Sequence, residues 1–104
     1  MLAVRVEVIK WIEDAQPGMV ACRLFDVWGN QHTFVEKLPV VTTAWLDSNS
    51  TYPQPGWIAC EVVQQRLDDS GRDIITITTG QPRTVTLILG VTQFEVLSEQ
   101  LADI

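Results

Sequence analysis

The clearest fold signal lies in residues 19–37, which read MVACRLFDVWGNQHTFVEK. Apolar residues at every second position predict a strand over Met19–Val27 with one buried face. Trp28-Gly29-Asn30-Gln31 supplies Gly and Asn, which tolerate the backbone of a tight turn. His32–Lys37 then returns, and the short link predicts that the two strands are antiparallel.

The same alternation continues outward from this hairpin. Leu2, Val4, Val6 and Val8 repeat with period two before the turn formers of Glu13–Gly18. Towards the C-terminus, β-branched runs separated by polar turns predict further strands. These are one long strand over Trp57–Leu67, a turn at Asp68–Asp73, strands at Ile74–Thr79, Arg83–Leu89 and Thr92–Leu97, and a turn at Gly80–Pro82.

The longest irregular section is Leu38–Gly56. Its Pro39 lacks a backbone donor, and Thr42–Ser50 is predicted to contain one short helical turn. A second helical turn is predicted at Glu99–Ala102, with Ser98 as its cap.

These patterns predict one all-β domain spanning residues 1–104, with about seven strands and one or two short helical turns. We expect a small antiparallel, partly open barrel, because one core must serve every strand. A β-sandwich is the alternative.

The composition limits the classes of partner. Thirteen acidic residues stand against seven basic ones, a formal charge of −6, and the basic residues are scattered singly along the sequence. A phosphate backbone is repelled by such a charge, so we expect no nucleic-acid binding. The longest apolar run is far too short to span a bilayer, and charged residues interrupt Met1–Ile12, so we expect a cytoplasmic protein without a signal peptide or membrane contact.

Chemistry-bearing motifs are absent from the sequence. It contains no GxGxxG, GxxxxGK[ST], GxSxG or HExxH pattern, and no metal-ligand spacing. Cys22 and Cys60 lie outside any CxxC motif and are expected to be buried, reduced thiols. We therefore expect no cofactor, no metal and no catalytic residue, and lean against an enzyme.

His32, the sole histidine, supports an alternative. It lies just past the hairpin turn, and Cys22 and Asp26 lie on the paired strand. A small enzyme or ligand-binding barrel could use His32 with Cys22 or Asp26.

Four tryptophans in a chain of this size are unusual. Tryptophan and tyrosine are enriched at binding hot spots, and two prolines limit the freedom of the Tyr52–Trp57 segment before binding. The predicted interaction surface comprises Trp28, Trp45, Tyr52, Pro53, Pro55 and Trp57.

Two segments carry a resemblance. Thr33–Val41, TFVEKLPVV, and Tyr52–Val62, YPQPGWIACEV, resemble a group of short bacterial proteins with TFVEK-x-PVV and YPxPGxIACEV segments. The likeness covers roughly residues 6 to 63. No activity, cofactor or catalytic residue is known for that group, so the resemblance implies only a small bacterial, cytoplasmic protein.

The sequence thus favours a non-enzymatic module that binds another protein. An all-β chain without a covering helix also leaves a pairable strand edge. A homodimer through that edge is a further expectation.

Overall fold

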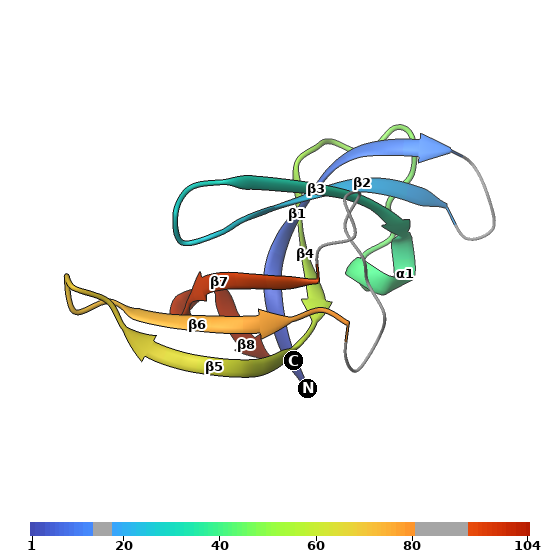
Figure 1. Ribbon diagram of the computed structural model, residues 1–104. Coiled ribbons are helices and arrows are strands. Elements are labelled where there is room, and N and C mark those ends of the chain that lie inside the picture. The colour runs from blue at the N-terminus through green and yellow to red at the C-terminus, as the bar shows by residue number, and fades with distance from the viewer. Residues whose placement is uncertain (14–17, 81–91) are drawn as a thin grey trace.

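A computed structural model of the chain describes residues 1–13, 18–80 and 92–104, which form two antiparallel β-sheets (Figure 1). The first sheet contains β1 (Leu2–Glu13), β2 (Met19–Phe25), β3 (Gln31–Lys37), β4 (Gln54–Ala59) and β8 (Leu101–Asp103). The second contains β5 (Glu61–Leu67), β6 (Asp73–Thr78) and β7 (Gln93–Leu97). Two short helices complete the elements, α1 (Leu38–Val41) and the 3-10 helix η1 (Ser98–Gln100).

The first sheet has the order β3-β2-β1-β4. The predicted hairpin is confirmed: β2 and β3 are antiparallel, with Cys22 opposite Phe34 and Leu24 opposite His32. β4 pairs with one edge of β1 from Ala3 to Val8. β8 pairs with the start of β1 and therefore occupies its other edge, beyond the end of β2.

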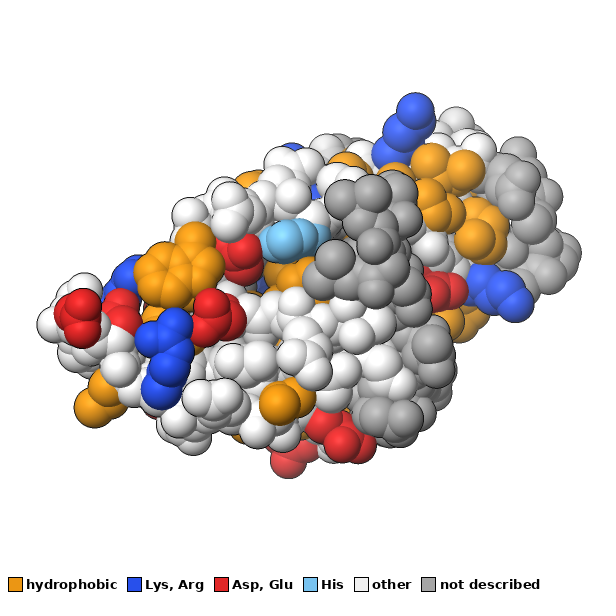
Figure 2. Space-filling view, in the orientation of Figure 1, with side chains coloured by type: hydrophobic (Ala, Val, Ile, Leu, Met, Phe, Trp, Pro, Cys, Tyr) orange, Lys and Arg blue, Asp and Glu red, His pale blue; other side chains and the backbone are white. Residues whose placement is uncertain are grey.

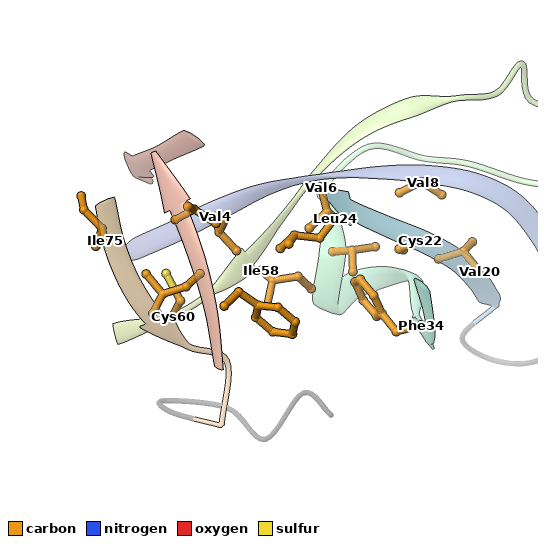
Figure 3. Close-up of a cluster of buried hydrophobic side chains, with 14 of the residues drawn as sticks. Val4, Val6, Val8, Val20, Cys22, Leu24, Phe34, Ile58, Cys60 and Ile75 are labelled. Atoms are coloured by element: carbon orange, nitrogen blue, oxygen red, sulfur yellow. The ribbon is translucent and has the colours of Figure 1, made fainter. Parts of the chain in front are cut away.

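The core lies against the inner face of the first sheet (Figure 3). Strand alternation turns Val4, Val6 and Val8 of β1 inward, and all three are buried. The second sheet covers one part of this face with Ile77 of β6 and Phe94 and Val96 of β7, all buried. Val41 of α1 and Leu46 of the following loop join the same cluster. The opposite, outer face of the first sheet carries alternating residues that are exposed or half-exposed.

The all-β fold class is confirmed, but the sheets are not closed into a barrel. The expected long strand Trp57–Leu67 is divided at Cys60. The Cys60 N–H still donates to Leu2 O at 3.0 Å, and from Glu61 onward the chain pairs with β6 in the second sheet. A continuous β-rich run in the sequence does not reveal where a chain passes from one sheet to the other.

Both predicted helical turns are displaced. The first helix is α1, not a turn within Thr42–Ser50; Pro39 lies in its first turn, where its fixed φ fits and no N–H is needed. At the other end, η1 ends at Gln100, and Leu101–Asp103 pairs with Leu2–Val4 instead of continuing a helix.

Two hairpin turns share one backbone design. In Asp26-Val27-Trp28-Gly29-Asn30 and Asp68-Asp69-Ser70-Gly71-Arg72, the aspartate side chain accepts from the N–H groups two and four residues later. Gly29 and Gly71 have φ of 82° and 81°, a left-handed conformation that glycine adopts without strain. The predicted strand Arg83–Leu89 lies outside the described residues, as does most of the predicted turn Gly80–Pro82.

Candidate functional site

A surface hollow of about 340 Å³ lies where the β2–β3 turn meets the second sheet. Its volume is at the lower end of the range of ligand pockets. Figure 2 shows this face, with the histidine in pale blue next to acidic and hydrophobic side chains. The hollow is lined by Asp26, Trp28, His32, Thr76, Gln93, Phe94 and Glu95.

Asp26 and His32 are brought together at this hollow, with 3.0 Å between Asp26 Oδ2 and His32 Nε2. Partial burial alone would raise the pKa of Asp26, but hydrogen bonds from His32, Asn30 and the Trp28 N–H outweigh it and lower the pKa. Asp26 is therefore ionised at neutral pH, and since a carboxylate only accepts, His32 Nε2 carries a proton. The imidazole ring also packs edge-on against Phe94, with 5.0 Å between ring centroids.

An imidazole held by a carboxylate is an arrangement that can serve a general base. In the described chain no nucleophile hydrogen-bonds to the His32 ring. Cys22, the other predicted partner, is fully buried, and burial raises the pKa of its thiol to about 12. It therefore lacks the thiolate that nucleophilic catalysis requires.

Trp28 lies at the edge of the hollow and is tied to the second sheet. Its Nε1–H donates to Glu95 Oε1 at 3.2 Å, and Glu95 Oε2 accepts from Arg66 at 2.8 Å. The hydrogen bond from Arg66, followed by that from Trp28, lowers the pKa of Glu95. The Arg72 guanidinium lies 5.3 Å from the centroid of the Trp28 ring, so the two matching hairpin turns contact each other through their side chains.

Trp45 is in a different environment. It lies in the loop between α1 and β4 and is 91% exposed, with no hydrogen bond or ring contact to any described residue. The loop around it is nevertheless held in place. Asp47 bonds to Ser50 and Asn49, and the Tyr52 hydroxyl donates to Asp47 O at 2.7 Å.

The other predicted surface residues divide between two locations. Tyr52 is half-buried and packs against the core, while Pro53 is exposed beside it. Pro55 and Trp57 are in β4 and belong to the outer face of the first sheet, opposite Glu7 and Arg5 respectively. The six predicted residues therefore do not form one continuous patch, and Trp28 lies at the far end of β2 from this loop.

Glu95, Arg66 and Arg72 were not predicted from the sequence as partners of Trp28. The repeated Asp-x-x-Gly pattern of the two turns is present in the sequence and predicts two similar hairpins. It does not predict that Arg72 of the second turn packs over Trp28 of the first.

β5 is the strand most open to solvent. All seven of its residues are exposed, including Val62, Val63 and Leu67. It pairs with β6 on one side, and no described strand pairs with its other edge. The expected homodimer through a strand edge stays a prediction, and β5 is the edge that fits it best.

The structure also bears on metals, membranes and thiols. Among the described residues, no group of three or more His, Cys, Asp or Glu side chains could hold a metal ion. No helix in the described ranges has the length and apolar character needed to cross a membrane. Cys22 and Cys60 are both buried free thiols, as the sequence predicted.

Comparison with known proteins gave no match to a family model, a curated protein or a solved structure. The geometry described above is therefore the basis for assigning a function.

Proposed function

We propose that this protein is a non-enzymatic protein-interaction module of the bacterial cytoplasm, and that Trp45 is an anchor of its contact surface. The observation that carries the proposal is the 91% exposure of Trp45 on a loop that is otherwise well bonded. The two free thiols fit a reducing compartment.

The physical argument starts from the cost of leaving tryptophan in water. Burying one removes about 150–250 Å² from solvent, which is worth about 4–6 kcal/mol at about 25 cal/mol per Å². In the folded chain the Trp45 side chain stays exposed, so this burial energy does not contribute to the stability of the fold. A partner would gain it at low entropic cost, because Asp47 and Tyr52 already order the loop.

The test begins with quantitative co-purification of the tagged full chain from its own cells, comparing wild type with Trp45→Ala. Leu67→Ala, at an exposed apolar site on β5, is the matched control. A protein lost with Trp45→Ala is then purified, and its Kd for each variant is measured directly. We expect Trp45→Ala to weaken binding at least about tenfold with an unchanged melting temperature.

Two outcomes would refute the proposal. One is that the purified partner binds wild type and Trp45→Ala equally. The other is that wild type retains no stoichiometric partner.

A second candidate function is supported by the Asp26–His32 pair at the hollow. This is the small enzyme or ligand-binding protein that His32 suggested. Against it, both Asp26 oxygens already accept hydrogen bonds within the turn. The test is a small-molecule library screened by NMR against wild type, with His32→Ala as the control. If no compound shifts the Phe94 and Thr76 signals of wild type while leaving those of His32→Ala unchanged, this second function is excluded.

A further inference from the structure

The outer face of the first sheet concentrates positive charge that the sequence scatters. The inter-strand register places Arg23 beside Thr33 and Glu7, Lys10 opposite Ala21, and Arg5 opposite Trp57. Lys37, opposite Met19, belongs to the same face. We call Arg5, Lys10, Arg23 and Lys37 the basic face. It holds four of the seven basic residues of the chain.

The cations of the basic face differ from those of the second sheet in how many of them are paired with carboxylates. Arg66 and Arg72 are committed to Glu95 and Asp68, at 2.8 Å each. Arg5, Lys10 and Lys37 form no ion pair with another described residue, and the first two are exposed on β1. Their positive charge is therefore available to a partner.

One carboxylate, Glu7, lies among the described side chains of this face, and it binds Arg23 at 3.1 Å. By its backbone register Glu13, opposite Met19, also belongs to this face. Counted with Glu7 and Glu13, the basic face carries a formal charge of +2 while the whole chain carries −6, so the remainder of the sequence carries −8. The net charge of this face is therefore opposite in sign to that of the chain as a whole, which favours an acidic partner here.

Apolar groups stand between these cations. Phe25 is 40% exposed and Val35 is 44% exposed, and Trp57 is half-exposed in the row of Arg5. A hollow of about 240 Å³ opens here, lined by Arg5, Val6, Glu7, Arg23, Phe25 and Gln100. Arginine beside aromatic side chains is the composition of binding hot spots.

We propose that the basic face docks a short acidic segment of a partner protein, in which Asp or Glu side chains meet Arg5, Lys10 and Lys37 and an apolar side chain enters the hollow at Phe25. This inference rests on the proposed interaction function and names the chemistry of its partner.

Two observations favour an acidic polypeptide over a nucleic acid. The Arg23 guanidinium lies 5.5 Å from the Phe25 ring centroid, so that ring is not a bare platform for base stacking. The face is also only about 20 Å across at ordinary strand spacings, and a long phosphate backbone would run on past it to the acidic remainder of the chain.

The experiment uses the full chain and a labelled short peptide of alternating Glu and Leu, read by fluorescence anisotropy. The variant Arg5→Gln, Lys10→Gln, Lys37→Gln removes three charges that support no ion pair within the described chain. The matched control is Gln64→Glu, Ser70→Glu, Ser98→Glu, which changes the net charge by the same amount at exposed sites elsewhere. A peptide with Lys in place of Glu and an oligothymidylate are the other two probes.

We expect the Glu peptide to bind wild type and the control equally, and the neutralised variant at least about tenfold more weakly. Raising salt from about 50 mM to about 300 mM should weaken binding, since the charges are exposed. Failure of the Glu peptide to saturate wild type, equal weakening in both triple variants, or tighter binding of oligothymidylate through the same three cations would overturn the inference.

The two proposals fail separately. Suppose that the partner lost with Trp45→Ala binds the Arg5→Gln, Lys10→Gln, Lys37→Gln variant as tightly as wild type. The basic face is then not the surface that binds this partner, but the proposed interaction function stands. If the Glu peptide depends on the basic face but no Trp45-dependent partner exists, the proposed role of Trp45 fails and the basic face stands.

Discussion

Trp28 and Trp45 have the same side chain in two contrasting settings. Trp28 is 49% exposed, donates to Glu95 and lies under the Arg72 guanidinium. Trp45 is 91% exposed and touches none of these groups. The backbone beside Trp28 is also bound, since Val27 N–H donates to Glu95 O at 2.8 Å.

The contrast shows how the two sheets are joined. The β2–β3 turn docks on the edge of β7, and Trp28 covers that junction; it belongs to the tertiary structure although it is half in water. The loop of Trp45 is fastened through Asp47 and Tyr52 instead, so that its tryptophan contributes nothing to the fold. Trp28→Ala should therefore lower the stability of the fold, whereas Trp45→Ala should weaken partner binding and leave the stability unchanged.

The largest effect is expected at Tyr52, which supports the Trp45 loop. Tyr52→Ala removes a half-buried ring that packs against the core and the hydroxyl bond to Asp47. We expect a loss of about 3 kcal/mol in the free energy of unfolding, measured by urea denaturation. Tyr52→Phe, which keeps the ring, should cost about 1 kcal/mol. A Tyr52→Ala variant as stable as wild type would show that the loop is not anchored through this ring.

The middle effect tests the comparison itself. Trp28→Ala should lower the free energy of unfolding by about 2 kcal/mol, because it removes partly buried ring area, the bond to Glu95 and the cation–π contact with Arg72. Trp45→Ala should change it by less than about 0.5 kcal/mol, the usual range for exposed sites. Both are measured by the same denaturation. Equal losses at the two positions would remove the distinction drawn above.

Sequence reasoning succeeded where one local pattern settles the structure. The alternation in residues 19–37 was enough to predict the β2–β3 hairpin and the two faces of β2. It failed where the structure of a segment depends on residues distant in the sequence. The strand break at Cys60 depends on the hydrogen bond to Leu2. Leu101–Asp103 forms a strand because it pairs with Leu2–Val4.

The same limit applies to function. The sequence placed Trp45 in the irregular section but did not determine that its side chain is exposed. The contacts of Trp28 depend on Glu95 and Arg72, which are distant in the sequence. The basic face was missed because its four cations are far apart in sequence and meet only through the register of β1, β2 and β3.

The smallest effect concerns the turn that carries Trp28 and depends on pH. Asp26→Asn keeps an oxygen acceptor for the Trp28 and Asn30 N–H groups but loses the charge that faces His32. We expect it to cost about 1 kcal/mol at neutral pH, the scale of weakening a charge-assisted hydrogen bond.

The sign of the pH dependence follows from the lowered pKa of Asp26 in the folded state, compared with its ordinary value of 3.8. A group whose pKa is lowered by folding stabilises the fold fully above its ordinary pKa, and this contribution is lost as the pH falls through the folded value. Asparagine does not titrate. Relative to its value at pH of about 5, the difference in unfolding free energy between wild type and Asp26→Asn should therefore shrink as the pH falls below about 4. Glu95, the carboxylate on the facing strand β7, is present in both proteins and largely cancels in the difference. Urea denaturation of both proteins across this range provides the measurement, and a difference that stayed constant or grew towards low pH would show that the charge on Asp26 does not hold the turn.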